Sequence, residues 1–429
     1  MQSLKVGIIG YGTIGTGVAR ILLNERELLS KRCGRDVELH TLAELNLQQK
    51  PDIDLSSVKL VKDAGLLLDD DQVDIIVEVV GGVSPAKEFI EKALKRRKHV
   101  VTANKELIAK HGAELFSLAR ENKVCLLCEA SSGGGIPIIQ ALTSALVANR
   151  FQKIYGILNG TTNYILTKMH EEGADFTSVL KEAQKLGYAE ADPSSDVDGH
   201  DVAYKLSILG CFAFDSYFDT AKIYREGIRS ISHRDIELAC EFGYVIKLLA
   251  IGVAIDDDNV ELRVHPVMLP REHPLAAVSG SFNAVYVEGN SVGETMFYGR
   301  GAGELPTASA IVGDIVHIAR YACPDGDAFP LQFGTGKKKT LVSIGEIVSQ
   351  YYLRLIVRDS AGVLASISRV FGDNAVSIHV VHQKDSLGED AELVIMTHAV
   401  KEAQMLKAIQ EIKDLDIVTE VCSLIRTDL

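Results

Sequence analysis

The sequence lacks both an excess of basic residues and an apolar run long enough to span a bilayer. Its 45 lysine and arginine residues stand against 58 aspartate and glutamate residues, a formal net charge of −13. Such a charge disfavours a phosphate-backbone partner, and no basic stripe with interleaved aromatic residues is present. A transmembrane helix needs about 20 mostly apolar residues. We therefore expect neither a nucleic-acid nor a membrane partner.

Cysteine is also scarce. The seven cysteines are an odd number and lie scattered among apolar neighbours, which is typical of reduced thiols in a cytoplasm. Cys125 and Cys128 form a CxxC, but residues three apart on a strand point to opposite faces. We expect neither a redox pair nor a metal clip there. The chain enters a strand almost at once, without a signal peptide, so we expect a cytoplasmic location.

A glycine motif follows this first strand, which is expected at 4–9. Gly10, Gly12 and Gly15 form a GxGxxG that continues into an apolar helix. In that context the glycines let the backbone approach a pyrophosphate, which lies at the helix N-terminus. The alternative is a tight strand–helix turn without a nucleotide. The pattern favours a Rossmann-type, doubly wound dinucleotide domain.

The second strand, expected at 37–42, is followed by Glu44. An acid near this position accepts a hydrogen bond from a ribose hydroxyl, whereas an arginine would bind the 2′-phosphate of NADPH. We therefore predict that NADH is used in preference to NADPH.

Buried parallel strands are expected at 73–80, 99–102 and 124–128, because these runs are nearly continuous in apolar residues. Ligands bind at the carboxyl ends of such strands, so Lys105 is predicted to face the reactive end of the cofactor. The densest basic run, at 95–98, lies at an expected helix end. The glycines of 133–135 and Glu129 offer oxygen ligands for a hard cation. A tight crossover without metal is the simpler alternative.

From about residue 136 the pattern changes. It predicts helices at 137–148 and 308–321, strands at 154–158, 261–266, 284–287 and 295–298, and a glycine loop at 299–307. These elements indicate a mixed sheet with helices on one side. Residues 322–347 have the composition of a linker. The βαββαβ order that follows is a split-βαβ unit.

The segment 187–205 combines an acidic loop with an apolar helix. Its loop carries several acids, of which Glu190 and Asp196 are candidate substrate ligands. In the helix, Lys205 is the only charged side chain between Val202 and Phe214, one turn after Asp201. A desolvated lysine beside a carboxylate makes a proton donor. A structural ion pair under a polar loop is the alternative.

With these motifs the chain resembles the bacterial homoserine dehydrogenases that carry a C-terminal ACT domain. The resemblance covers essentially all of the chain and rests on GYAEADPSSDVDGHDVAYK at 187–205, TANK at 102–105, NGTTN at 159–163 and GRGAGELPT at 299–307. It implies the NAD(P)H-dependent reduction of L-aspartate 4-semialdehyde to L-homoserine, towards threonine and methionine.

The resemblance also implies an α/β fold in several parts. The expected parts are a Rossmann-type domain (1–135, completed by about 303–321), an α+β substrate and dimerisation domain with a mixed sheet (136–321), a linker (322–347) and a ferredoxin-like ACT domain (348–429). An ACT domain implies an amino-acid effector, for which we predict L-threonine, near the turn 359–362. ACT units commonly pair, so we expect a homo-oligomer, either a dimer or a tetramer.

Roles for individual residues follow from the same resemblance. Lys205 is similar to the proton donor, Lys105 to the second catalytic lysine, and Asp201 to a residue that serves both catalysis and substrate binding. The implied substrate ligands also include Glu190, Tyr188, Gly160 and Thr161. The implied cofactor ligands are Gly10, Gly12, Thr13, Ile14, Gly15, Thr102, Lys105 and Gly303, beside the Glu44 identified above. A Na⁺ site is implied at Glu129, Ser132, Gly134 and Ile136. The family often has Arg-Asp where this chain has Ala43-Glu44, which agrees with the preference for NADH.

Two other classes of protein stay open at this point. A different amino-acid-pathway dehydrogenase acting on a semialdehyde needs a cysteine nucleophile, and no cysteine here has a suitable setting. A non-catalytic sensor would keep the nucleotide and ACT folds and use the lysines for structure only.

Overall fold

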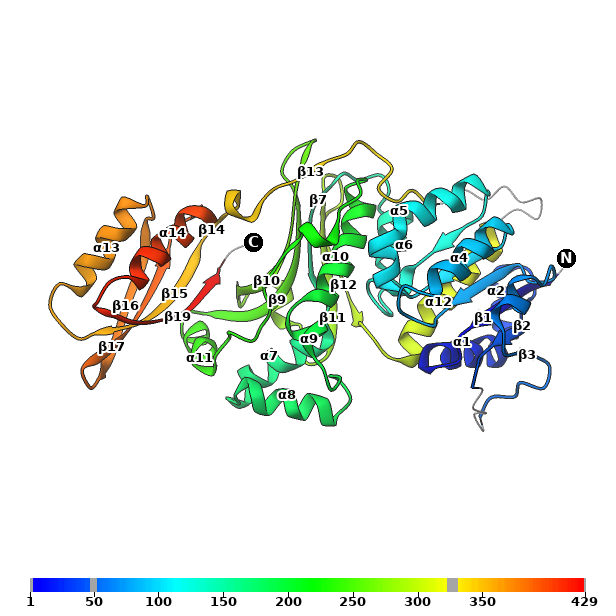
Figure 1. Ribbon diagram of the computed structural model, residues 1–429, viewed down its shortest axis with the longest axis horizontal. Coiled ribbons are helices and arrows are strands. Elements are labelled where there is room, and N and C mark those ends of the chain that lie inside the picture. The colour runs from blue at the N-terminus through cyan, green and yellow to red at the C-terminus, as the bar shows by residue number, and fades with distance from the viewer. Residues whose placement is uncertain (1–2, 47–51, 322–330, 428–429) are drawn as a thin grey trace. The chain divides into compact units, whose positions relative to one another are not determined.

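The computed structural model describes residues 3–46, 52–321 and 331–427, and Figure 1 labels the elements. The chain divides into two compact units. The first comprises Met1–Ile154, Tyr204–Lys222 and Asn283–Lys339. The second comprises Tyr155–Ala203, Ile223–Phe282 and Thr340–Leu429. Each unit therefore contains several separate stretches of the sequence.

A six-stranded parallel sheet forms the centre of the first unit. Its strand order is β3-β2-β1-β4-β5-β6. The strands are β1 (Leu4–Ile9), β2 (Val37–Ala43), β3 (Lys59–Val61), β4 (Ile75–Glu78), β5 (His99–Thr102) and β6 (Leu126–Leu127). This order is that of the doubly wound dinucleotide fold. The Rossmann-type prediction is confirmed.

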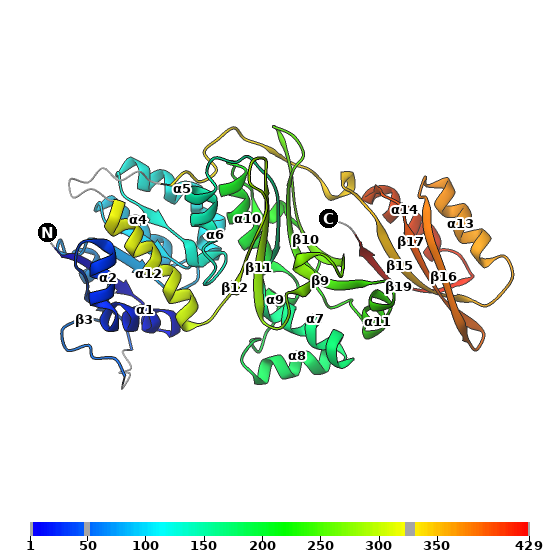
Figure 2. The same ribbon diagram turned by 180° about the vertical axis from the view of Figure 1, so that it is seen from behind.

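Helices cover this sheet. They are α1 (Thr13–Asn24), α2 (Arg26–Cys33), α3 (Ala64–Leu68), α4 (Ala86–Lys95), α5 (Lys105–Glu121) and α12 (Glu304–Tyr321). Helix α12 comes from far along the chain and packs beside α1, as Figures 1 and 2 both show, and it shares one apolar core with β1 and β2. Helix α12 is therefore part of the packing around this sheet. The helix starts at Glu304, four residues before the predicted start, because Pro306 is accommodated in its first turn.

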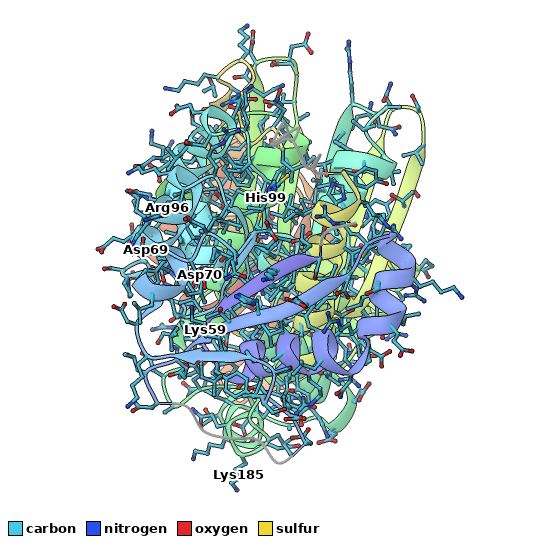
Figure 3. The ribbon with its side chains drawn as sticks, turned by 90° about the vertical axis from the view of Figure 1, so that its right-hand side faces the viewer. Lys59, Asp69, Asp70, Arg96, His99 and Lys185 are labelled. Carbon is cyan, nitrogen blue, oxygen red and sulfur yellow. The ribbon has the colours of Figure 1, made fainter. Side chains whose placement is uncertain are left out.

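The basic run at 95–98 has a structural role at the amino ends of the strands. Helix α4 ends at Lys95, and Arg96 pairs with Asp69 at 2.8 Å. Lys98 is buried, and its Nζ donates to the carbonyl oxygens of Asp70 and Val73. Figure 3 shows Arg96, Asp69 and Asp70 together along one side of this unit. The run is therefore part of the scaffold, as its place at a helix end predicted.

The helix predicted at 137–148 is shorter and partly irregular. Its sequence forms α6 (Ile138–Gln140) and then a π-helical turn, η2 (Ala141–Ala145). The amide of Leu146 reaches back to the carbonyl of Ala141, five residues earlier. Beyond this turn lie β7 (Phe151–Ile157), where the chain passes to the second unit, and the later strands β11 (Phe282–Gly289) and β12 (Gly293–Arg300).

The second unit contains a helical part and a sheet. The helices are α7 (Gly160–Glu172), α8 (Phe176–Lys185), α9 (Ser194–Val197) and α11 (His233–Glu241). Strands β8 (Tyr224–Arg225), β9 (Tyr244–Ala254) and β10 (Asn259–Pro270) follow along the chain. Strand β9, which the sequence did not reveal, is antiparallel to β10 over its whole length. Strand β8 is parallel to β10, so the predicted mixed sheet is present.

The predicted βαββαβ unit is also present, within the second unit of the chain. Its elements are β15 (Tyr351–Arg358), α13 (Val363–Asp373), β16 (Ile378–Leu387), β17 (Asp390–Thr397), α14 (Glu402–Lys413) and β19 (Val418–Arg426). The strand order β19-β15-β17-β16 is antiparallel throughout, with α13 and α14 packed into one apolar core. Strand β19 also pairs with β10 at Val267 and Arg426, which joins this domain to the mixed sheet.

Within the predicted linker, residues 322–330 lie outside the described part of the chain. The remainder is not wholly irregular, since Thr340–Leu341 forms a short strand, β13, beside β10. Across the described ranges, no helix has both the length and the apolar character needed to cross a membrane.

Candidate active site

The glycine loop after β1 has the backbone geometry that a pyrophosphate requires. Gly10 has a φ of +103°, and a Cβ built on Gly15 would lie 2.0 Å from the carbonyl oxygen of Gly10. Larger residues are therefore excluded at both positions. Gly12 faces open space and precedes Thr13 and Ile14, the first residues of α1. The free N–H groups of that helix start suit an anion.

Glu44 lies beside this loop. One of its carboxylate oxygens accepts a hydrogen bond from the amide of Tyr11 at 2.7 Å, and the other accepts from the amide of Asn46 at 3.1 Å. These contacts lie at a cavity of about 390 Å³. It is lined by Tyr11, Gly12, Thr13, Thr16, Glu44, Asn46 and Glu304. A dinucleotide therefore fits the residues present, with an acid at the place predicted for the ribose.

Two predicted site residues, Thr102 and Lys105, lie with the unpredicted Glu78 at the carboxyl ends of β4 and β5. Thr102 ends β5, and Lys105, which is half-buried, starts α5. Thr102 donates from its hydroxyl to Glu78, the last residue of β4, at 2.7 Å. The side chain of Asn104 caps α5 by accepting from Leu107. Glu78 was not anticipated, because on the sequence it is one polar residue inside an apolar run.

The turn predicted to hold Na⁺ is tightly packed. Both carboxylate oxygens of Glu129 accept backbone hydrogen bonds, from Ile139 at 2.8 Å and Gln140 at 2.7 Å. Burial raises the pKa of Glu129 to about 7, and burial together with Glu129 raises the pKa of Asp314 to about 8. A Cβ on Gly134 would lie 2.2 Å from the carbonyl oxygen of Gly301. This close approach explains the glycine at position 134.

The loop 299–307 carries Gly303, which has a φ of +123° and directly precedes α12. The first unit thus contains every predicted cofactor residue: the glycine loop, Glu44, Thr102, Lys105 and Gly303.

The second unit contains the predicted substrate residues of the NGTTN turn and the acidic loop. Asn159 caps α7 by accepting from Thr162 at 2.8 Å, as expected of Asn before a helix. Its amide nitrogen also donates to Asp196 at 2.7 Å and to Asp201 at 3.0 Å. One amide thereby holds two carboxylates at the helix start beside Gly160. No local pattern of the sequence marks this bridge.

Two further predicted ligands lie along the same turn. The hydroxyl of Thr161 donates to the carbonyl oxygen of Tyr188 at 2.5 Å, and the Tyr188 ring lies 4.9 Å from that of Tyr164. The Tyr188 side chain is half-exposed, and Glu190 is exposed. The backbone carbonyl of Glu190 accepts from Gln184. The structure thus brings Gly160, Thr161, Tyr188, Asp196 and Asp201 together around Asn159.

Helix α10 (His200–Ala213) carries Asp201 and Lys205, as predicted. Asp201 is 2% exposed and Lys205 is 8% exposed. A lysine so deeply buried is unusual unless its charge is compensated or used. Burial raises the pKa of Cys125 to about 11 and that of Cys211 to about 12, so neither of these two thiols offers a competing nucleophile.

Known proteins match the chain over its full length. A family described as homoserine dehydrogenase matches residues 137–316, its NAD binding domain matches 10–129, and an ACT domain matches 351–416. The homoserine dehydrogenase of Bacillus subtilis (strain 168) is 41% identical over 432 residues, covering 100% of this chain and 99% of the relative.

Solved structures agree. The crystal structure of a homoserine dehydrogenase from Thiobacillus denitrificans has a TM-score of 0.94 and 40% identity, covering 100% of this chain and 98% of that one. A hyperthermophilic archaeal homoserine dehydrogenase in complex with NADPH has a TM-score of 0.63 and 28% identity, covering 75% of this chain and 99% of that one.

Proposed function

The chain belongs to the homoserine dehydrogenase family, and from this premise we propose which of its residues carry the reaction and which nicotinamide it prefers. It is an NAD(P)-dependent oxidoreductase that acts on a CH–OH group and interconverts L-aspartate 4-semialdehyde and L-homoserine. It carries an ACT domain at its C-terminal end. The family therefore replaces the two alternatives, the non-catalytic sensor and the cysteine-dependent dehydrogenase.

Lys205 is the proposed proton donor, and its burial in an apolar helix is the observation that carries the proposal. When bound, the nicotinamide supplies the hydride. An ammonium at Lys205 polarises the aldehyde oxygen and gives it a proton, which is worth about 10²–10⁴ in rate. Lys105 is the second catalytic lysine, and it stands at the carboxyl end of β5. Absorbance of NADH in the presence of aspartate semialdehyde tests the activity directly.

The substrate is held by the second unit's residues in this proposal. Glu190 binds the α-ammonium of the amino acid, since it is an exposed acid in the loop. Asn159 fixes the carboxylates of Asp196 and Asp201. Gly160, Thr161 and Tyr188 complete the proposed substrate pocket. In the first unit, Gly10, Gly12, Thr13, Ile14 and Gly15 cradle the pyrophosphate, and Thr102 and Gly303 lie at the nicotinamide side.

We assign 1–135 with 303–321 to the nucleotide domain, 136–321 to the substrate and dimerisation domain, 322–347 to the linker and 348–429 to the ACT domain. The enzyme works in the cytoplasm as a dimer or tetramer. We also propose a Na⁺ ion at Glu129 and the carbonyl oxygens of Ser132, Gly134 and Ile136.

NADH is the proposed preferred cofactor. The Glu44 carboxylate is held next to the glycine loop, where it accepts from a ribose hydroxyl and repels a 2′-phosphate. Glu44→Arg is expected to move the ratio of kcat/KM for NADPH over NADH upwards by roughly tenfold or more, which corresponds to about 1.4 kcal/mol.

The matched control for this change is Glu27→Arg, the same charge reversal at an exposed site on α2. It is expected to leave the ratio unchanged. If the unmodified enzyme itself prefers NADPH about tenfold, the proposed role of Glu44 is wrong.

L-Threonine is the proposed effector of the ACT domain. Gly362 has a φ of +95° and precedes α13, so the turn 359–362 permits close approach of a ligand backbone to free N–H groups. Allosteric coupling is typically about 5–150-fold in affinity. Asp359→Ala is expected to shift the threonine inhibition curve of the full-length enzyme to higher concentration.

Asp373→Ala, at the exposed far end of the same helix, serves as the control and should retain the native curve. An enzyme that is insensitive to threonine before any substitution would leave the ACT domain with an assembly role only.

A further inference from the structure

Glu78 is a buried acid whose hydrogen-bond partners are all neutral. It is fully buried at the end of β4, between Ile9 of β1 and Thr102 of β5. One carboxylate oxygen accepts from the amides of Val80 at 2.9 Å and Gly81 at 3.4 Å. The other accepts from the hydroxyl of Thr102 at 2.7 Å. Burying an acid without a cation is costly.

The hydrogen bonds continue from Glu78 towards Lys105. The hydroxyl that Thr102 donates to Glu78 also accepts from the amide of Asn104 at 3.0 Å. The side chain of Asn104 caps α5 and donates to the carbonyl oxygen of Gly82 at 2.6 Å. Lys105 is the next residue and the first of α5. The chain of bonds therefore fixes the corner on which Lys105 is mounted.

The same carboxylate holds the turn that borders the glycine loop. Gly81 and Gly82 both have positive φ, of +78° and +68°. A Cβ on Gly10 would lie 3.0 Å from the carbonyl oxygen of Val79. The turn after β4 is thus in contact with the pyrophosphate loop, and Glu78 ties it to the end of β5.

We propose that Glu78 is a positioning residue, which holds Lys105 and the end of β5 in register with the glycine loop. The inference rests on the proposed catalytic role of Lys105. Both oxygens of Glu78 accept hydrogen bonds, from Val80 and Gly81 on one side and from Thr102 on the other. Burial raises the pKa of Glu78 against the effect of these bonds. An amide has one acceptor and one donor end, so the side chain in Glu78→Gln can keep accepting from Val80 and Gly81 only if its NH₂ group faces Thr102, which forces the Thr102 hydroxyl to change from donor to acceptor.

Glu78→Gln is therefore expected to lower kcat by about 10–100-fold, because misplacing a catalytic group by about 1 Å costs rates of that order. The thermal unfolding midpoint is expected to change little, since the residue volume is unchanged. Thr102→Val removes the donor from the other end of the bond and is expected to act in the same direction. Thr41→Val on β2 of the same sheet is the control, because the buried hydroxyl of Thr41 has no hydrogen-bond partner in the described part of the chain.

The decisive measurement is the double variant Glu78→Gln with Lys105→Ala. If Glu78 acts through Lys105, Glu78→Gln lowers kcat further by less than about twofold in the Lys105→Ala enzyme. An equal loss in both backgrounds overturns the proposal, as does a kcat for Glu78→Gln within twofold of native. If Glu78→Gln does not fold, Thr102→Val takes its place in the cycle. An active Lys105→Ala enzyme would instead reject the catalytic role of Lys105, which separates the two failures.

Discussion

Lys205→Ala is expected to lower kcat by at least ~10²-fold while nucleotide binding is retained. The oxygen that develops negative charge loses its proton donor, whereas the glycine loop and Glu44 are untouched. The measurements are steady-state kcat with aspartate semialdehyde and the dissociation constant for NADH. The effect is large because Lys205 is the only charged side chain in an apolar stretch of α10.

Two companion variants sharpen this test. Lys222→Ala removes an exposed lysine of the same unit and is expected to keep full activity. Lys105→Ala should lower kcat similarly and also weaken nucleotide binding, because Lys105 stands at the carboxyl end of β5. Near-native turnover by Lys205→Ala would falsify its assignment as proton donor.

Local sequence patterns were sufficient for the parts of the fold that depend on local physics. The glycine loop was predictable because only glycine tolerates the φ of Gly10 and the close approach at Gly15. The central strands were predictable because strands buried on both faces are continuously apolar. The C-terminal βαββαβ order was predictable because each of its elements has its own periodicity in the sequence.

The contacts that organise the site depend on residues distant in sequence, and no local pattern marks them. Asn159 reads as a cap, and its bonds to Asp196 and Asp201 exist only because the acidic loop returns to the start of α7. In the sequence Glu78 is one polar residue in an apolar strand, and only the pairing of β4 with β5 places it beside Thr102. Strand β9 was missed because its apolar run does not distinguish strand from helix. For the site, the resemblance to a family located the residues, and the structure supplied what holds them.

A buried ionic cluster in the second unit provides the largest expected effect on stability. Asp235 is fully buried at the start of α11 and accepts from Arg354 of β15 at 2.8 Å, from Ser423 at 2.5 Å and from Ser232 at 2.6 Å. Arg354 also lies 3.6 Å from Glu392. The cluster connects α11 with the strands of the ACT domain.

Arg354→Ala is expected to destabilise the unfolding transition of this unit by about 3–5 kcal/mol, because the buried Asp235 loses its cation. Arg358→Ala, an exposed arginine on the same strand, is the matched control and is expected to change stability by less than about 0.5 kcal/mol. Urea unfolding followed by far-UV circular dichroism measures both, since the chain contains no tryptophan.

The dependence of this loss on pH identifies its cause. Burial acts to raise the pKa of Asp235, but the hydrogen bonds from Arg354, Ser232 and Ser423 outweigh it and hold the pKa below its usual value. In the native enzyme Asp235 therefore stabilises the fold above its unfolded-state pKa of about 3.9, and this contribution is lost as the pH falls through the lower folded-state pKa. Without Arg354, burial dominates and the pKa of Asp235 rises. Protonation then removes the unpaired buried charge from the variant. The loss of stability should thus be smaller at pH 5 than at pH 7.5, on the order of 1 kcal/mol for each unit of pKa gained.

Arg354→Met combined with Asp235→Asn should be more stable than Arg354→Met alone, and equal stability of the two would show that lost packing, not an unpaired charge, explains the effect.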